Sequence, residues 1–585
     1  MSLLTVEQLS VRYGDVAAVD DLSFTVAKGE SVGLAGESGS GKSQTALAVL
    51  GLLPRNASVT GSIRFAGDEL VGKTEAELND MRASKVAMVF QDPLQALNPF
   101  MSIGAQLSRI LLQHRMVTGV AARDRVICML ERVGLPDAAR QYAAYPHELS
   151  GGMRQRAMIA SALLAGPDLL IADEPTTALD VTVQAQILDL LDEIREETSL
   201  LLITHDLGVI AGRCERMLVL ESGRLAEEGR TQDVFRQPQH EHTAALLSAA
   251  MRLDRADIPQ RQQGEEVFTV DGAKVSYRIA GGEVLKAVRD VDLAVRAGET
   301  VAVVGESGSG KSSLVRAALG LVPMKAGRVV FCGDTLAPRL KNRDQATRRG
   351  MQLVFQDPAG SLNPQMRVAS IVAEPLIVHE PGLSPEKRKQ QVVAMLDKTG
   401  LGPEYLQRYP HELSGGQAQR VAIARALILG PKVLVCDEAV AALDGTVREQ
   451  VLQLLRQVQE ETGLAIIFIT HDLAVVRAIS HRVVVMYLGG LVETAANEAL
   501  FTAPMHPYTK ALLEAVPVPD PDNAGGRTTV TGEVPSVLRP PAGCTFHPRC
   551  PHVRDECRTD RPEGREVGLT TVSCHRAEEL ASEHR

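Results

Sequence analysis

The chain contains no tryptophan, and aromatic residues make up only 3% of its 585 residues. No apolar run reaches the eighteen or so residues that can span a bilayer. The N-terminal stretch MSLLTVEQLSVRYG lacks the charged and then apolar segments of a signal peptide. We therefore expect neither a membrane span nor an interfacial aromatic belt. If the protein works at a membrane, another chain must hold it there.

An excess of positive charge is also missing. The formal net charge is −10, so the chain has no electrostatic footprint for nucleic acid and little attraction to anionic lipid. Apolar residues make up 45% and charged residues 23%, as in globular proteins with sizeable cores. The length is sufficient for three or four domains of ordinary size.

Cysteine is sparse, with eight residues in the whole chain. Cys128, Cys214, Cys332 and Cys436 are scattered, and we expect them to be small buried hydrophobes in a reducing compartment. The other four cysteines all lie within the last 42 residues.

The sequence repeats itself once. GESGSGKSQT at 36 returns as GESGSGKSSL at 305, and FQDP, YPHELSGG, an Asp-Glu segment and ITHDL also occur twice in the same order. The offset is 269 residues for the lysines, 265 for the glutamines and 266 for the histidines. Motifs in one order at a nearly constant offset indicate a duplicated domain, and the period is far too long for a solenoid.

Each copy alternates strand-like and helix-like segments. An apolar strand enters each glycine loop (SVGLAG at 31, TVAVVG at 300), and amphipathic helices at 183–197 and 447–461 precede further apolar strands. This order predicts an α/β fold with a parallel sheet covered by helices. We expect domains at 1–251 and 267–515, a polar linker at 252–266, and a Pro/Gly-rich region with four cysteines at 516–585.

GxxxxGKS between a strand and a helix is typical of a phosphate-binding P-loop. Its glycines let backbone N–H groups close around phosphates at a helix N-terminus. Lys42 and Lys311 should reach the β- and γ-phosphates, while the Ser43 and Ser312 hydroxyls should ligate Mg²⁺. One such octapeptide could be a flexible loop, but two in matching contexts favour nucleotide binding.

An Asp-Glu pair follows an apolar run in each copy, at 173–174 and 437–438. A carboxylate at a strand end can hold Mg²⁺ through water, so this role is expected of Asp173 and Asp437. The neighbouring Glu174 and Glu438 can polarise an attacking water. A solvent-facing acidic strand terminus is the alternative, and it does not explain the recurrence.

LSGGMRQR (149–156) and LSGGQAQR (413–420) resemble the signature motif of ABC-transporter ATPases. The order P-loop, FQD, LSGG, DE, ALD and THD resembles this family over about 500 residues. The resemblance implies two tandem P-loop NTPase domains, each with a mostly parallel sheet core, an antiparallel β subdomain and a helical subdomain. It also implies that ATP is clamped head to tail, with each P-loop facing the other domain's LSGG.

The resemblance assigns roles to further residues. Catalytic roles are implied for Gln91, Gln356, Glu174, Glu438, His205 and His471, and Mg²⁺ contacts for Ser43, Gln91, Asp173, Ser312, Gln356 and Asp437. Nucleotide contacts are implied for Tyr13, Gly36, Ser38, Gly39, Gly41, Lys42, Ser43, Gln44, Ser150, Gly151, Gly152, Tyr277, Gly305, Ser307, Gly308, Gly310, Lys311, Ser312, Ser313, Ser414, Gly415 and Gly416. Tyr13 and Tyr277 resemble the aromatic residue that stacks on adenine, but each could equally be a half-buried strand tyrosine.

One departure from the family pattern is visible. The first copy has DEPTTALD, whereas the second has DEAVAALD with Ala439 in place of proline. The acidic pair is kept, so we expect both sites to hydrolyse ATP. Their rates are expected to differ, because proline stiffens the segment beside the glutamate.

The segment FTAPMHPYTKALLEAVP (501–517) resembles the His-Pro-Tyr helix start of oligopeptide and dipeptide importers. FRQPQHEHTAALLSAA (235–250) is an altered first copy, in which Glu241 and His242 replace Pro and Tyr. An ordinary helix start with proline in its first turn is the alternative interpretation.

The tail bearing Cys544, Cys550, Cys557 and Cys574 resembles the cysteine-bearing tail of the same subfamily, which in some members holds a [4Fe–4S] cluster. Four thiols in a Pro-rich segment need something to organise them. Iron–sulfur is favoured, with zinc or no ligand as alternatives. Disulfides fit poorly with a cytosolic ATPase, and the short knuckles of zinc sites are missing. His547, His552 and His575 are possible substitute ligands.

The resemblance thus implies the ATP-hydrolysing subunit of a peptide importer, peripheral at the cytoplasmic face of the cell membrane. Its implied partners are two transmembrane permease subunits and an extracytoplasmic binding protein, with no nucleic acid. A related importer of nickel, glutathione or another small solute is the alternative, because an ATPase subunit does not read the cargo. A soluble ribosome-associated ABC factor is less favoured, because the linker is short and the chain lacks a basic tail.

Overall fold

The computed structural model describes residues 2–114, 117, 119–177, 179–255, 264–279, 282–440, 443, 445–523, 532 and 534–583. Most of the expected linker, residue 178 of the first ALD motif, residues 442 and 444 of the second, and residues 524–531 of the C-terminal region lie outside these ranges. The chain divides into two compact units. The first contains Met1–Leu179, Val183–Met251 and Pro517–Arg527, and the second contains Asp180–Thr182, Arg252–Val516 and Thr528–Arg585.

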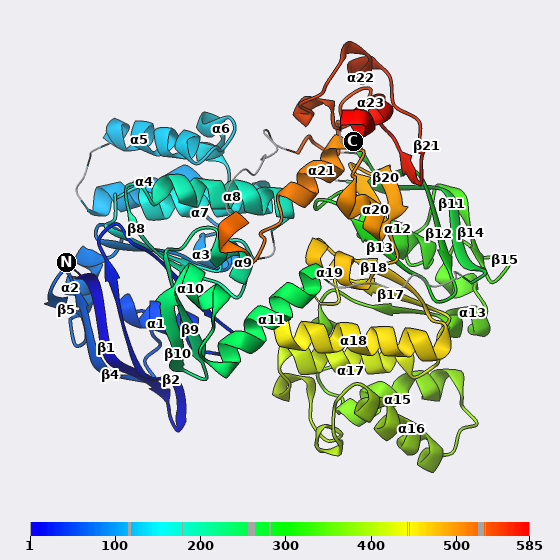
Figure 1. The fold of residues 1–585 in the computed structure, drawn as a ribbon, viewed down its shortest axis with the longest axis horizontal. Helices are drawn as coiled ribbons and strands as arrows, with labels where there is room; N and C mark the ends of the chain where they lie inside the picture. Colours follow the sequence, from blue (N-terminus) through cyan, green and yellow to red (C-terminus); the bar gives the residue numbers. More distant parts are fainter. Residues whose placement is uncertain are drawn as a thin grey trace. The chain divides into compact units, whose positions relative to one another are not determined.

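An antiparallel sheet opens the first unit, with strand order β2-β1-β4-β5 (Figure 1). Its strands are β1 (Ser2–Tyr13), β2 (Val16–Ala27), β4 (Ala57–Phe65) and β5 (Asp68–Glu69). Alternate residues of β1 are buried, but the buried set changes from even to odd positions between Val6 and Leu9. A bulge between Glu7 and Ser10 in the β1–β4 register causes this change, because one extra residue reverses the side-chain period.

The second sheet of this unit has the order β10-β9-β3-β8-β7-β6. It comprises β3 (Ser31–Gly36), β6 (Val86–Val89), β7 (Leu169–Asp173), β8 (Ser199–Ile203), β9 (Arg216–Glu221) and β10 (Arg224–Arg230). All neighbours are parallel except β9 and β10. The segments LLIAD and SLLLI are buried at every residue, as expected of strands covered on both faces.

Helices cover this sheet and form a separate helical group. The helices are α1 (Lys42–Val49), α2 (Glu75–Met81), α3 (Pro93–Ala96), α4 (Ile103–Gln113), α5 (Gly119–Arg132), α6 (Ala138–Ala143), α7 (Gly151–Leu163), α8 (Val181–Ile194), α9 (Leu207–Ala211), α10 (Thr231–Arg236) and α11 (Glu241–Arg255). In Figure 1, α4, α5 and α6 lie beside α7, and they pack against one another. The expected helix at 183–197 is present, but it begins two residues earlier and ends at Ile194.

The second unit repeats this plan. Its antiparallel sheet contains β11 (Glu266–Arg278), β12 (Val284–Arg296), β14 (Ala326–Phe331) and β15 (Asp334–Thr335), and its larger sheet contains β13 (Thr300–Val304), β16 (Met351–Val354), β17 (Val433–Asp437), β18 (Ala465–Ile469), β19 (Arg482–Tyr487) and β20 (Gly490–Ala496). Its helices are α12 (Lys311–Ala318), α13 (Gln345–Gly350), α14 (Pro358–Ser361), α15 (Val368–His379), α16 (Pro385–Lys398), α17 (Gly415–Leu427), α18 (Gly445–Thr462), α19 (Leu473–Ile479), α20 (Asn497–Thr502) and α21 (Pro507–Glu514). The predicted pair of α/β domains with parallel sheets and antiparallel subdomains is confirmed.

The cysteine-bearing tail packs onto the second unit. It contains α22 (Asp555–Thr559), β21 (Arg565–Val567), β22 (Thr570–Val572) and α23 (Ala577–Glu583). Strand β22 pairs with β20 and therefore extends the larger sheet. Among the described residues neither a disulfide nor a metal-ligating group marks the tail as a cysteine-rich module, so that part of the predicted fold is not supported.

The scattered cysteines correct one expectation. Cys214 and Cys436 are buried as predicted, but Cys128 and Cys332 are exposed. Cys128 lies on the outer face of α5, and Cys332 lies in the turn after β14. Other residues do not cover either side chain. No helix in the described ranges is long and apolar enough to cross a membrane.

Candidate functional site

The first glycine loop joins the buried strand β3 to α1, as the sequence predicts. Gly36, Gly39 and Gly41 have φ values of 150°, 82° and 98°, which glycine adopts without the strain of a side chain. A Cβ at Gly36 would lie 2.5 Å from the Leu220 carbonyl oxygen, and one at Gly41 would lie 2.5 Å from that of Ala18. A residue with a side chain therefore does not fit at Gly36 or Gly41.

The lysine and serine of this loop point to different partners. Lys42 is buried, and its ammonium donates to the carbonyl oxygens of Gly36 and Glu37, both at 2.8 Å. The Ser43 hydroxyl donates to Asp173 Oδ1 at 3.1 Å. The two expected Mg²⁺ ligands, which are 130 residues apart in the chain, are therefore in direct contact.

Glu174 is the centre of a hydrogen-bonded group. Its carboxylate accepts from Gln91 Nε2 at 2.8 Å and from the Thr177 hydroxyl at 2.9 Å, and it lies 3.0 Å from His205 Nδ1. Burial alone would raise the pKa of Glu174, but its bonds to His205 and Thr177 outweigh burial and lower the pKa. The carboxylate thus stays ionised at neutral pH, as a group that polarises water requires.

The backbone of this glutamate is strained. Glu174 has a φ of 46° and Glu438 a φ of 52°, in a left-handed region that costs a non-glycine residue about 1 kcal/mol or more. The same strain at both equivalent positions indicates that the fold holds each carboxylate in a fixed direction.

The second unit assembles the same group from its own motifs. Lys311 donates to the Gly305 and Glu306 carbonyl oxygens at 2.6 and 2.9 Å, and Ser312 donates to Asp437 Oδ1 at 2.8 Å. Gln356 Nε2 donates to Glu438 Oε2 at 2.5 Å. Gly305, Gly308 and Gly310 again have positive φ values.

The two groups differ in detail. His471 Nδ1 lies 3.6 Å from Glu438 Oε1, longer than the 3.0 Å between His205 and Glu174. Arg316 lies 3.3 Å from Asp437, whereas the equivalent position in the first copy is Leu47. The second acidic pair therefore has an additional cation beside it.

Each predicted stacking tyrosine contacts the helix after its glycine loop. The Tyr13 hydroxyl donates to Gln44 Oε1 at 2.6 Å, and the Tyr277 hydroxyl donates to Ser313 Oγ at 3.2 Å. Both rings are half-buried at the end of the hairpin, and their stacking on adenine stays a prediction.

The signature motif starts a helix in both units. Ser150 caps α7 by accepting from the Met153 N–H, and Ser414 caps α17 by accepting from the Gln417 N–H. Cβ atoms at Gly152 and Gly416 would lie 2.5 and 2.8 Å from Val183 and Val447. That these motifs complete the site of the opposite unit stays a prediction.

The glutamine of the signature helix has different contacts in the two copies, which carry Pro175 and Ala439 at equivalent positions. Gln155 Nε2 donates to the Pro175 carbonyl oxygen at 2.6 Å and thereby ties α7 to the segment after Glu174. The equivalent Gln419 is equally buried, but its Nε2 has no hydrogen-bond partner in the described part of the chain. The substitution of Ala439 for proline is thus accompanied by loss of this tie.

Sequence reasoning did not assign Thr177 or Arg316. Thr177 follows Glu174 by three residues in DEPTTALD, and Arg316 is one helical turn after Ser312. Helical spacing could have placed Arg316 near the P-loop serine, but only the sheet order brings it to Asp437.

The four tail cysteines line one small cavity of about 20 Å³, together with His506, His547, His552 and His575. Burial raises the pKa of Cys544, and it raises those of Cys550 and Cys574 to about 11. Among the described residues, however, no group of three or more potential ligands has the geometry of a metal site. The predicted convergence of cysteines is therefore present, but the predicted cluster is not supported by this geometry.

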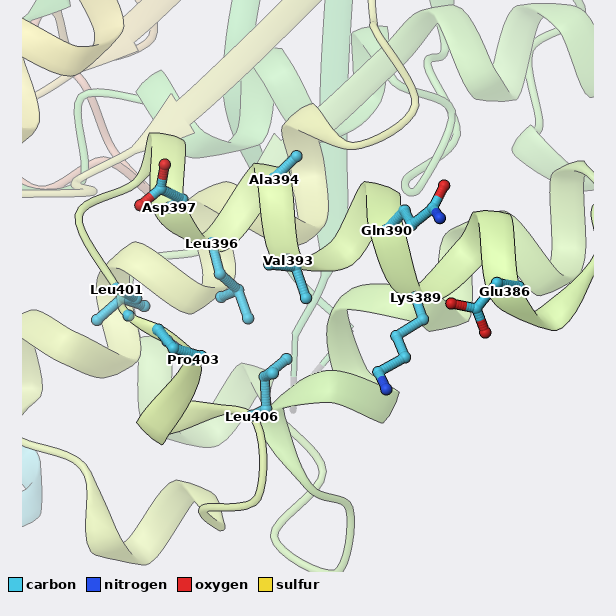
Figure 2. Close-up of a pocket in the computed structure, with 11 residues that line it drawn as sticks. Glu386, Lys389, Gln390, Val393, Ala394, Leu396, Asp397, Leu401, Pro403 and Leu406 are labelled. Atoms are coloured by element: carbon cyan, nitrogen blue, oxygen red, sulfur yellow. The ribbon is translucent and has the colours of Figure 1, made fainter.

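A larger cavity, of about 360 Å³, lies along α16 and the following turn. Figure 2 shows Val393, Leu396, Leu401, Pro403 and Leu406 around it. None of the predicted site residues lines this cavity.

Comparisons with known proteins agree with this geometry. The family model "ABC transporter" matches residues 19–177 and 288–441, more than half of the chain. The model "Oligopeptide/dipeptide transporter, C-terminal region" matches residues 226–272 and 492–557. The second model includes both the His-Pro-Tyr segment and its altered first copy.

Named relatives align along nearly the whole chain. The glutathione import ATP-binding protein GsiA of Escherichia coli (strain K12) is 41% identical, covering 92% of this chain and 93% of that protein. The GsiA protein of Shigella boydii gives the same identity and coverage. The peptidoglycan transport ATP-binding protein YejF of Agrobacterium fabrum is 44% identical, covering 88% of this chain and 96% of that protein.

In a chain that already carries Glu438→Gln, the further substitution Glu174→Gln is expected to keep nucleotide binding and to lower turnover at least about a hundredfold, because a neutral amide cannot polarise water as a carboxylate does. ATP binding and phosphate release, measured on the same preparation, check this. The chain with Glu438→Gln alone is the reference. Equal turnover of the two chains would remove Glu174 from this role.

Gln155→Ala should destabilise the protein by about 1–2 kcal/mol more than Gln419→Ala, because Gln155 donates to a buried carbonyl and Gln419 Nε2 has no partner in the described ranges. Both changes remove the same buried atoms, so the difference isolates the hydrogen bond. Urea unfolding of the two variants measures it. Equal losses would show that the bond to Pro175 adds no stability.

Proposed function

Because the chain belongs to the ABC transporter family, we propose that it is the energy-coupling subunit of a membrane importer for oligopeptides, dipeptides or a related small solute. It is an ATP-hydrolysing transport enzyme. The observation that carries the proposal is the pairing of two complete Gln–Glu–His groups with two matches to the peptide-transporter C-terminal region.

In this proposal each unit supplies one P-loop and one acidic pair. The loop lysines Lys42 and Lys311 neutralise the β- and γ-phosphates, and Ser43–Asp173 and Ser312–Asp437 hold Mg²⁺. Glu174 and Glu438 orient and polarise the attacking water, and His205 and His471 donate to the γ-phosphate. With Mg²⁺ bound, Gln91 and Gln356 would contact both the ion and that water.

The signature motifs act in trans in this proposal. Ser414 with Gly415 and Gly416 completes the site of Lys42, and Ser150 with Gly151 and Gly152 completes that of Lys311. A serine hydroxyl and free N–H groups at a helix start suit capture of the γ-phosphate. ATP binding then closes the two domains, and hydrolysis with product release reopens them.

The direction of transport and the partners come from the C-terminal region. Its match to the peptide-transporter family favours two transmembrane permease subunits, a binding protein outside, and a peripheral position at the cytoplasmic face of the membrane. The relatives are named for glutathione and peptidoglycan transport, so glutathione and peptides are the leading cargo classes, with nickel a weaker candidate. A ribosome-associated role would leave the C-terminal match unexplained.

For the tail we propose a ligand held by Cys544, Cys550, Cys557 and Cys574. The donor set fits an iron–sulfur cluster or zinc, because four thiols converge on one cavity. Either ligand would convert the thiols to thiolates and release their protons.

Purification of the tagged chain from detergent-solubilised native membranes should recover two membrane-spanning subunits. ATP turnover of this complex should rise when a binding protein loaded with peptide or glutathione is added, because substrate delivery promotes domain closure. The same complex with both Glu174→Gln and Glu438→Gln should show no rise. Recovery of ribosomes in place of membrane subunits would contradict the importer assignment.

The tail ligand is tested by purification without oxygen, followed by iron, sulfide and zinc analysis. About four iron and four sulfide per chain would establish a cluster, and about one zinc would establish the zinc alternative. Cys550→Ser should lose the ligand, whereas Cys128→Ser, outside the tail, should keep it. Absence of every metal in the unsubstituted chain would refute the proposed ligand.

A further inference from the structure

A buried ion pair links the second P-loop to the cysteine-bearing tail. Arg549 Nη1 donates to Glu306 Oε1 at 3.0 Å and to Oε2 at 2.9 Å, and each side chain is only 2% exposed. Glu306 is the residue after Gly305 in the second P-loop, and Arg549 immediately precedes Cys550. The pair therefore joins two segments that are 243 residues apart in the chain.

Two tyrosines contact the two partners of this ion pair. The Tyr508 hydroxyl accepts from the Glu306 backbone N–H at 2.9 Å, and the Tyr487 hydroxyl accepts from Arg549 at 3.4 Å. The rings of Tyr487, Tyr508 and Phe546 pack together, with centroids 4.6 to 5.5 Å apart. All three are fully buried, so the backbone of Glu306 and the side chain of Arg549 both contact a rigid aromatic cluster.

The pair also adjoins the catalytic lysine. The Glu306 carbonyl oxygen accepts from Lys311 Nζ at 2.9 Å. Displacing Glu306 would therefore remove one of the carbonyls that direct the Lys311 ammonium. Arg549 acts on this lysine through Glu306 rather than by touching the nucleotide.

The cysteine cavity adjoins the aromatic cluster. Phe546 lines this cavity with the four cysteines, and so does His506, which caps α21 by accepting from the Tyr508 N–H. Cys544 and Cys550 pack against the hydrophobic cluster that contains Tyr487 and Tyr508. A change in the position of Cys550 thus moves the arginine next to it.

The first unit has a different pair at the equivalent positions. Glu221 and His242 stand where the second unit has Tyr487 and Tyr508, 266 residues later. His242 Nδ1 lies 3.4 Å from Glu221 Oε1. No cysteine-bearing tail follows the first copy, so its P-loop has no equivalent of Arg549 in sequence.

An ion pair this deeply buried is a poor source of stability, because removing two charges from water costs several kcal/mol per ion. Arg549 Nε is also buried and has no hydrogen-bond partner within the described ranges. A hydrophobic pair of similar volume would often be as stable. The retained charges are therefore better explained by the direction they impose on Glu306 than by stability.

We propose that Arg549 is a positioning residue for the second ATP site, through which the cysteine-bearing tail controls nucleotide binding at the Lys311 P-loop and not at the Lys42 P-loop. This inference rests on the proposed binding of ATP by both loops. Loss of tail structure would release Glu306 and weaken one site selectively.

Photolabelling of the full chain with 8-azido-ATP tests this inference. Labelled tryptic peptides are assigned by mass to the first or the second unit over a range of nucleotide concentrations. Arg549→Met should raise the concentration for half-labelling of the second unit by about tenfold or more, because it leaves the Glu306 charge buried and unpaired. Labelling of the first unit should not change.

Two further variants separate positioning from general structural damage. The double variant Arg549→Met with Glu306→Gln should recover much of the lost labelling, because it removes both buried charges and leaves none unpaired. Arg549→Lys keeps the charge without the planar guanidinium. Its concentration for half-labelling of the second unit should lie between those of the unsubstituted chain and Arg549→Met. If Arg549→Met does not fold, Arg549→Lys decides by the same site-selective criterion.

The outcomes distinguish the two proposals. A loss of labelling that is confined to the second unit and is relieved in the double variant supports the inference. Unchanged labelling of the second unit, or equal loss in both units, overturns it. Failure of the unsubstituted chain to label either unit would instead refute the proposed ATP sites.

Discussion

The carboxyl ends of four adjacent parallel strands meet at one edge of each sheet, and every candidate catalytic group depends on this constraint. In the first unit the neighbouring strands β3, β8, β7 and β6 lead into the P-loop, His205, the Asp-Glu pair and Gln91. The strands β13, β18, β17 and β16 do the same in the second unit. Motifs separated by more than a hundred residues are thus brought to within hydrogen-bond distance. The apolar strand sequences matter for function because their burial fixes that strand order.

The duplication preserves the chemistry but not the surroundings. Both units keep the serine–aspartate contact and the glutamine–glutamate contact. The second unit has a longer histidine–glutamate distance and an arginine beside its aspartate. Its signature-helix glutamine, Gln419, has no hydrogen-bond partner for Nε2 among the residues that the structure describes. The two sites have the same catalytic side chains but different neighbouring contacts. We expect them to hydrolyse ATP at different rates, because the neighbouring contacts set the direction of each reacting group.

The C-terminal segment contributes to the second unit in three physical ways. It adds β22 to the edge of the sheet, places Phe546 in the aromatic cluster, and supplies Arg549 to the P-loop. An edge strand gains hydrogen bonds for groups that would otherwise be unpaired. This explains how a Pro/Gly-rich segment with little apolar content is ordered without a disulfide among its described residues.

The sequence by itself determined the duplication, the α/β class, the two P-loops and the glutamine and histidine expected near each glutamate, because each of these depends on local patterns or on motifs of fixed spacing. Even helix positions such as 183–197 were predicted to within three residues. Only the tertiary structure decided the exposure of Cys128 and Cys332, the partner of Gln155 and the approach of Arg316 to Asp437. It alone brought Arg549 to Glu306. The physical reason is that these contacts join residues far apart in the chain, and no local pattern specifies which distant partner a buried polar side chain will meet.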